Sequence, residues 1–147
     1  MSEEKPQQPY RGRIAPTPSG YLHQGHIRTF RTAWNRAREK GGQIVFRMDD
    51  LDPSRCNQEY ANACTEDIRS MGIDWDEGPD RRGDFGPYEQ SKRGRFYLDA
   101  LQKLFELDLI YPCEKSRKEI KALGLLDSSG SEFLFPESFR PDSVDLE

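Results

Sequence analysis

The sequence predicts an α/β fold in which helices flank a parallel β-sheet. A short apolar run at residues 11–15 precedes a helical pattern over about 24–40, and a second apolar run at 43–48 precedes a helical pattern over about 57–70. Parallel strands need a crossover between them, and a helix usually provides it with right-handed chirality. The strand, helix, strand, helix order is therefore typical of a parallel sheet.

The boundaries of the elements follow from local signals. The first helix carries its apolar residues at helical spacing, and Gly41 and Gly42 end it before the second strand. The second helix ends at Gly72, and its expected buried stripe is Ala61, Cys64, Ile68 and Met71. Residues 76–90 are rich in Gly, Pro and charge, which predicts a loop. A helix is expected from about Ser91 to Leu107, with Tyr97, Leu101, Leu104 and Phe105 as its buried face.

Composition restricts the function classes. The net charge is -4, so affinity for nucleic acid has to come from local basic patches, and most of the Lys and Arg clusters are expected to be solvated helix faces. The three cysteines have no short paired spacing, which predicts neither a disulfide framework nor a metal knuckle. The polar start has no apolar signal-peptide core and no stretch could span a membrane, so a cytoplasmic protein is expected.

One stretch carries the chemistry. The loop after the first strand is stiffened by Pro16 and Pro18, and the chain's two histidines, His23 and His26, stand at the start of the first helix. The N-terminal end of a helix offers free backbone N–H groups and a positive dipole, which suit phosphate groups. Gly20 and Gly25 flank the histidines, and glycine is used where a ligand approaches the backbone closely. These features predict a phosphate-binding cradle.

The motifs are similar to those of the glutamyl-tRNA synthetases and their relatives, which are class I aminoacyl-tRNA synthetases. The stretches that carry the resemblance are Arg13-Ile-Ala-Pro-Thr-Pro-Ser-Gly20, Leu22-His-Gln-Gly-His26, Phe46-Arg-Met-Asp-Asp-Leu-Asp-Pro53, Gly72-Ile-Asp-Trp-Asp-Glu-Gly-Pro79, Pro87-Tyr-Glu-Gln-Ser-Lys-Arg93 and Tyr111-Pro-Cys-Glu-Lys-Ser-Arg-Lys118. The resemblance implies an incomplete Rossmann-like sheet, the N-terminal part of a class I catalytic domain. It also implies ATP-dependent activation of glutamate, with Mg²⁺ accompanying ATP, and transfer of glutamate to tRNA.

The resemblance assigns roles to single residues. Arg13, Ala15, Thr17 and Asp49 correspond to the glutamate site, although Asp49 stands where relatives usually have the longer glutamate. The ATP site corresponds to Pro18, Gly20, His23, Gly25 and His26, and the two histidines among them are the candidate catalytic residues. Residues 15–26 and 48–53 are both expected to follow strands and to face each other across one crevice.

Within the family, Tyr111-Pro-Cys113 followed by Ser116-Arg-Lys-Glu-Ile120 resembles the short glutamyl-Q-tRNA(Asp) synthetases. Those relatives hold zinc with a Cys-x-Cys and a downstream Tyr and Cys. Here Lys115 replaces the second thiolate and Phe135 and Phe139 stand in the downstream segment, so no zinc is predicted. The two phenylalanines are expected to pack together. The resemblance makes queuosine of tRNA-Asp the expected acceptor.

The family's second half, with its Lys-Met-Ser-Lys-Ser loop, has no counterpart in this sequence. The chain is therefore interpreted as an N-terminal portion that is truncated or that awaits a C-terminal half. The expected domains are a disordered tail over residues 1–9, the Rossmann-like domain over 10–110 and the start of an inserted subdomain over 111–147. Two alternatives stay open: a fragment of a glutamyl-tRNA synthetase that charges tRNA-Glu, and a catalytically inert ATP-binding half-domain.

Overall fold

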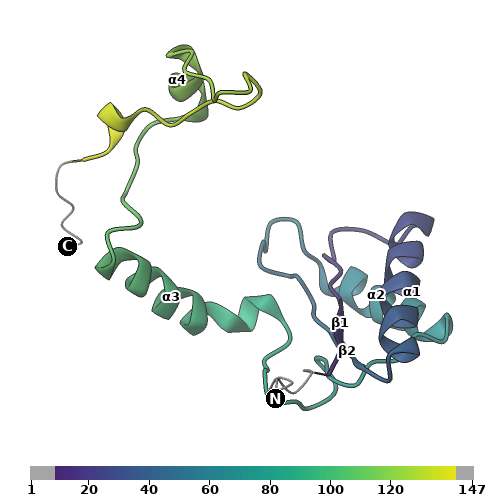
Figure 1. Cartoon of the computed structure of the whole chain (residues 1–147). Helices are drawn as coiled ribbons and strands as arrows, with labels where there is room; N and C mark the ends of the chain where they lie inside the picture. Colours follow the sequence, from purple (N-terminus) through teal and green to yellow (C-terminus); the bar gives the residue numbers. More distant parts are fainter. Residues whose placement is uncertain (1–8, 142–147) are drawn as a thin grey trace, which may run out of the picture. The chain divides into compact units, whose positions relative to one another are not determined.

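The computed structural model describes residues 9–141, and the chain divides between Gly94 and Arg95 into two compact units (Figure 1). Almost all of the expected disordered tail, residues 1–8, lies outside the described residues. The domain boundaries expected at residues 110 and 111 stay a prediction, since the two compact units do not define domains. Each unit is described by itself below.

The first unit holds the predicted strand and helix alternation. Strand β1 (Arg11–Ile14) leads through a loop to helix α1 (Gln24–Glu39), and strand β2 (Gln43–Phe46) leads to helix α2 (Gln58–Ser70). The strands are parallel, and Arg11 pairs with Gln43 and Ile14 with Phe46. The predicted α/β class with a parallel sheet is therefore confirmed, and in the described residues the sheet consists of these two strands.

The core lies on one face of the sheet. Side chains alternate along a strand, and Ile14, Ile44 and Phe46 are buried while their neighbours are exposed or half-buried. The same core cluster contains Phe30 and Ala37 of α1 and Cys64 and Ile68 of α2, so both helices cover this face (Figure 1). The predicted stripe of α2 is confirmed, with Cys64 and Ile68 fully buried and Ala61 and Met71 packed at its margin.

Gly12 allows helix α1 to lie close to β1. A Cβ atom added at Gly12 would lie 2.8 Å from Cδ1 of Ile44 and 3.4 Å from Cβ of Ala37. The first distance is inside van der Waals contact and the second is at its lower limit, so a side chain there would displace the Ile44 side chain and press on α1. Strand β1 precedes the histidine loop and helix α1 follows it, and the small residue at position 12 sets the spacing between them.

The opposite face of the sheet carries charged residues. Arg11 and Arg13 are exposed on this face, and Arg47 is half-buried beside them on the extension of β2. Arg11 reaches the buried carboxylate of Glu77 at 2.6 Å, and the hydroxyl of Tyr88 donates to the same carboxylate. Loop residues of the 77–88 segment thus pack on part of this face, while Arg13 stays exposed.

One edge of β1 has no partner strand among the described residues. The carbonyl groups of Tyr10 and Ile14 accept bonds from the N–H groups of Gln43 and Arg47, at 2.9 Å each. The backbone groups of Arg11 and Arg13 therefore point to the other edge. On the other side of β2, Val45 forms an isolated parallel bridge with Glu77. An open edge of this kind can pair with a further strand.

A 3₁₀ turn at Gln90–Arg93, at the end of the first unit, leads into helix α3 (Gly94–Glu106). The second unit contains the rest of α3, helix α4 (Arg117–Ala122) and a 3₁₀ turn at Glu137–Phe139. The prediction that one face of α3 is buried is wrong. Tyr97, Leu101 and Leu104 are 38%, 53% and 40% exposed, and Phe105 is only half-buried. The apolar spacing predicts a helix with one apolar side, but no apolar layer covers that side among the described residues of its own unit.

Phe135 and Phe139 of the second unit lie against each other, as expected. The rings of Phe135 and Phe139 lie 6.1 Å apart edge to face, and the ring of Tyr111 lies 5.8 Å from that of Phe135. Within residues 9–141, no group of three or more His, Cys, Asp or Glu side chains could hold a metal ion. In the same part of the chain, no helix is long and apolar enough to cross a membrane.

The three cysteines are expected to differ in reactivity. Burial raises the pKa of the Cys64 thiol to about 12, so its reactive thiolate is scarce at neutral pH, while Cys113 is exposed. A chromogenic disulfide reagent at pH 8 should label Cys113 first, half-buried Cys56 more slowly, and Cys64 only after urea is added. Rapid labelling of Cys64 in the native Cys56→Ser, Cys113→Ser variant would contradict the buried core position.

Candidate functional site

The loop after β1 is held at both of its prolines. Pro16 and Pro18 are buried, and their carbonyl groups accept bonds from the N–H groups of Asp49, at 2.9 Å, and Asn57, at 3.0 Å. The first bond joins the segment after β1 to the segment after β2, as the parallel sheet predicts. The stiff ring of each proline and these bonds fix the course of the loop.

His23 and His26 cap helix α1. The N–H of Gly25 donates to Nδ1 of His23 at 3.1 Å, and the N–H of His23 donates to Nδ1 of His26 at 3.4 Å. The expectation of free N–H groups at this helix end is therefore wrong for these two donors, because the imidazoles already accept from them. With Nδ1 as an acceptor, each neutral ring carries its proton on Nε2. The rings stack at 3.8 Å, so the helix end presents two Nε2 atoms.

A cavity of about 250 Å³ lies between this loop and the start of α1. Four of the predicted site residues line it: Ala15, Thr17, Gly20 and His26. The remaining lining residues are Pro16, Ser19, Tyr21, Leu22 and Phe30. The hydroxyl of Tyr21 donates to Glu59 of α2 at 2.8 Å, which raises the pKa of Tyr21 and ties the loop to that helix.

The two glycines of this loop differ in what surrounds them. A Cβ atom added at Gly25 would lie 2.9 Å from Cε1 of the His23 ring, whereas one added at Gly20 would meet nothing within 4 Å. The absence of a side chain at Gly25 is thus explained within the chain by the cap. Gly20 has no such steric reason, and its open surroundings face the cavity that it lines.

Replacing Gly25 by alanine is expected to displace the His23 ring and to lower the free energy of unfolding by about 1 kcal/mol, the usual value of an N-cap. The matched Gly20→Ala variant should unfold like the wild type, since its new methyl group meets no atom. Urea unfolding followed by circular dichroism measures both. Equal losses in the two variants would contradict the role of Gly25 in the cap.

Arg13 does not line the cavity with Thr17 and His26. It lines a separate groove of about 510 Å³ along β1 and α1, together with Tyr10, Arg11, Gly12, Arg28, Thr29, Thr32, Ala33 and Arg36. Among the described residues, Arg13 forms no ion pair, in contrast to Arg11. Its guanidinium is thus exposed to solvent on the charged face of the sheet.

Asp49 is not a lining residue of the cavity either. Its carboxylate is engaged by Arg47, whose Nε and Nη2 lie 2.6 and 2.9 Å from Oδ1 and Oδ2. The neighbouring acidic residues have local partners: Asp50 accepts from the N–H and hydroxyl of Ser91, and Asp52 from those of Ser54. The hydroxyl of Ser54 lowers the pKa of Asp52. The expected crevice is therefore lined by the first segment alone.

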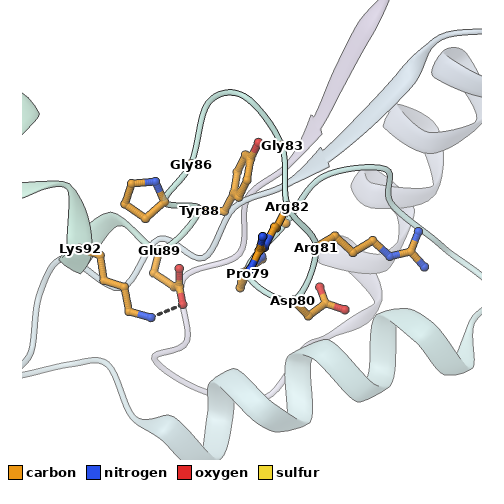
Figure 2. A pocket seen from close by; sticks show the side chains of 11 residues that line it. Pro79, Asp80, Arg81, Arg82, Gly83, Gly86, Tyr88, Glu89 and Lys92 are labelled. Carbon is orange, nitrogen blue, oxygen red and sulfur yellow. Dashed lines mark hydrogen bonds and ion pairs between the residues drawn. The ribbon is translucent and has the colours of Figure 1, made fainter.

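A second cavity of about 500 Å³ lies in the 78–92 segment and was not predicted from the sequence (Figure 2). Gly and Pro predict a loop there, but loops lack the periodicity from which a cavity could be located. Several of its charges are paired within the chain. Lys92 donates to Glu89 at 2.6 Å, and Asp80 accepts from the indole of Trp75 at 2.8 Å and from Arg69. Such pairing fits a structural loop better than a vacant charged site.

The cavity near the histidines offers donors without an internal carboxylate. The Thr17 hydroxyl and the Nε2 group of His26 can donate, and no lining residue is acidic. These neutral donors and the positive end of the α1 dipole are suited to an anionic group. Arg13 and the Arg47–Asp49 pair add charges of both signs at the same end of the sheet. The arrangement suits a phosphate compound beside a small zwitterion.

The sequence was compared with known protein families and with individual proteins, and the matches agree on one family. Residues 10–126 match the family described as tRNA synthetases class I (E and Q), catalytic domain. The chain is 47% identical over 113 residues to a glutamyl-Q tRNA(Asp) synthetase of Nitratidesulfovibrio vulgaris. The aligned region covers 77% of this chain and 35% of that relative. The chain is 41% identical over 115 residues to a glutamate–tRNA ligase of Tropheryma whipplei, covering 78% of this chain and 24% of the relative.

The fold comparison agrees. The crystal structure of a glutamate tRNA ligase from Elizabethkingia meningosepticum in complex with its amino acid superposes with a TM-score of 0.69 at 29% identity, covering 77% of this chain and 22% of that chain. The sequence described here thus spans about a third or less of the length of these relatives.

Proposed function

Because the chain belongs to the class I tRNA synthetase family for glutamate and glutamine, whose catalytic-domain pattern matches residues 10–126, we propose that it supplies the N-terminal part of a glutamate-activating enzyme. The observation that carries the proposal is the cavity formed by the proline loop and the N-terminal end of α1. The two-stranded parallel sheet is part of a Rossmann-like fold, and the chain superposes on the glutamate tRNA ligase from Elizabethkingia meningosepticum over 22% of that protein.

ATP occupies the cavity in this proposal. Gly20 leaves room for the nucleotide, and buried Pro18 holds the loop in place. His26 lines the cavity and the ring of His23 stacks on it at 3.8 Å. Both donate from Nε2 to the phosphates, because their Nδ1 atoms are occupied by the cap. Gly25 acts indirectly by leaving space for the His23 ring. Mg²⁺ would enter with ATP, whose phosphate oxygens are suitable ligands for it.

Glutamate binds beside the nucleotide. Arg13 takes a carboxylate of the amino acid with its planar fork, Thr17 and Ala15 flank the substrate, and Asp49 takes its ammonium group. An oxygen of the α-carboxylate attacks the α-phosphorus of ATP, the bond to pyrophosphate breaks, and glutamyl-adenylate forms. Fixed donors of the site stabilise the charge that develops on the transferring phosphorus. The adenylate then gives glutamate to a tRNA hydroxyl and releases AMP.

The acceptor is queuosine of tRNA-Asp in the proposal, since relatives at 46% and 47% identity are named glutamyl-Q tRNA(Asp) synthetases. The alternative acceptor, tRNA-Glu, draws on the matches to glutamate–tRNA ligases. The open edge of β1 supports a requirement for further chain, which would come from a C-terminal half. An inert ATP-binding half-domain is the remaining alternative. We place the reaction in the cytoplasm.

Pyrophosphate exchange tests the proposal. The 147-residue chain is combined with the separately produced C-terminal two-thirds of the Nitratidesulfovibrio vulgaris relative, and glutamate-dependent exchange into ATP is measured with and without tRNA. The resemblance implies that the short glutamyl-Q relatives activate glutamate without tRNA, whereas glutamyl-tRNA synthetases need it. Exchange without tRNA therefore supports the glutamyl-Q branch, and exchange only with tRNA-Glu supports the alternative. ATP binding without exchange in any combination would favour the inert half-domain.

A further inference from the structure

Arg47 and Asp49 form a two-point ion pair on the charged face of the sheet. The guanidinium Nε lies 2.6 Å from Oδ1 and Nη2 lies 2.9 Å from Oδ2, so both carboxylate oxygens are held. The two side chains are 26% and 22% exposed. Residues two apart in extended chain point to the same face, which explains the contact. A pair with both oxygens engaged fixes the plane of the carboxylate as well as its position.

The backbone on which this pair stands is fixed from both sides. The N–H of Arg47 donates to Ile14 at 2.9 Å, and the N–H of Asp49 donates to Pro16 at the same distance. On the other side, Met48 exchanges bonds with Tyr88 and Gln90. With the backbone held, the remaining freedom of Asp49 is in its two side-chain torsions, and Arg47 removes it.

The shared face also gives the order of the charges. Arg13 stands opposite Val45, so Arg47 lies between Arg13 and Asp49 along the strands. The aspartate side chain is short and cannot search for a ligand, so its usefulness depends on where its carboxylate is fixed. Each oxygen that accepts one bond from Arg47 keeps a further lone pair for a second donor.

We propose that Arg47 is a positioning residue that orients the Asp49 carboxylate toward the ammonium group of the amino-acid substrate. This inference rests on the proposed binding of glutamate by Asp49. Arg47 acts through Asp49 and does not itself hold the ammonium group. It therefore contributes to the selection of an amino acid over a dicarboxylate of the same length.

Glutarate, which has both carboxylates of glutamate but no ammonium group, separates this role from a general structural one. L-glutamate and glutarate are titrated into the 147-residue chain, and dissociation constants are obtained from amide shifts in ¹H–¹⁵N spectra. In Arg47→Met, glutamate affinity should fall about tenfold, the value of a lost charge-assisted bond, while glutarate affinity stays unchanged. Arg47→Lys keeps the positive charge but not the planar guanidinium, so its glutamate affinity should lie between those of the wild type and Arg47→Met. Arg82→Met is the control, because Arg82 is exposed and distant from the pair in sequence.

The double variant decides whether Arg47 acts through Asp49. Asp49→Asn should show the same reduced preference for glutamate over glutarate. The double variant Arg47→Met, Asp49→Asn should lose no more glutamate affinity than either single variant. Additive losses of glutamate affinity in the double variant would overturn the inference about Arg47, and so would an equal loss of glutamate affinity and glutarate affinity in Arg47→Met. Neither result would contradict the proposed amino-acid site itself. If the folded wild type bound neither ligand, the proposed amino-acid site itself would fail. Dispersed amide spectra establish the fold of each variant.

Discussion

Replacing Trp75 by alanine is expected to lower the free energy of unfolding by about 3–5 kcal/mol, a large part of the stability of a small domain. The side chain is 1% exposed and its ring packs 4.5 Å from that of Phe46. Its indole N–H donates to Asp80 at 2.8 Å, so truncation opens a cavity and also removes a hydrogen bond. The residue joins the segment after α2 to strand β2, and its loss should loosen the sheet that carries the site.

Urea unfolding followed by far-UV circular dichroism measures this loss. Leu51→Ala is the matched control, because Leu51 is 56% exposed and its truncation should change stability by less than about 0.5 kcal/mol. Trp75→Phe keeps an aromatic ring, so its loss in free energy of unfolding should lie between the losses of Trp75→Ala and Leu51→Ala. A loss below about 1 kcal/mol in Trp75→Ala would contradict its place in the core.

Replacing Arg13 by glutamine is expected to reduce kcat/KM for glutamate in pyrophosphate exchange by about a hundredfold or more. A planar guanidinium that binds a carboxylate at two points contributes several kcal/mol, which an amide cannot replace. The KM for ATP should change little, because Arg13 lines a different groove from His26. Arg13 forms no ion pair with any described residue, so little stability should be lost.

The matched control for this variant is Arg36→Gln. Arg36 lines the same groove as Arg13 but belongs to the far end of α1, so kcat/KM for glutamate should stay within about twofold of the wild type. Exchange is measured in the combination of this chain with the C-terminal portion of the relative. Equal losses in the two variants would show a general effect of positive charge and would contradict the specific role of Arg13.

The alternation of strands and helices was predictable because it depends on local signals. The glycines after α1 and α2, the apolar stripe of α2 and the short apolar strands each act over a few residues. The burial of α3 was not predictable in the same way. An apolar stripe at Tyr97, Leu101 and Leu104 shows which side of a helix is apolar, but not whether another element covers it.

The candidate site shows a similar division. Proline and glycine spacing located the loop, and the structure brings Ala15, Thr17, Gly20 and His26 to one cavity. Sequence reasoning assigned both imidazoles directly to phosphate and missed that their Nδ1 atoms cap the helix, since histidine is not among the preferred N-cap residues. The pairing of Asp49 with Arg47 could have been found from their spacing of two in extended chain.

The most direct test of the central proposal is to titrate the 147-residue chain with MgATP and to map the amide shifts in ¹H–¹⁵N spectra. If the proline loop and the start of α1 hold the triphosphate, shifts should concentrate at residues 15–26 and should weaken strongly in His26→Ala. Shifts confined to the 78–92 cavity, or no shifts at millimolar MgATP in the folded chain, would contradict a nucleotide site at the start of α1.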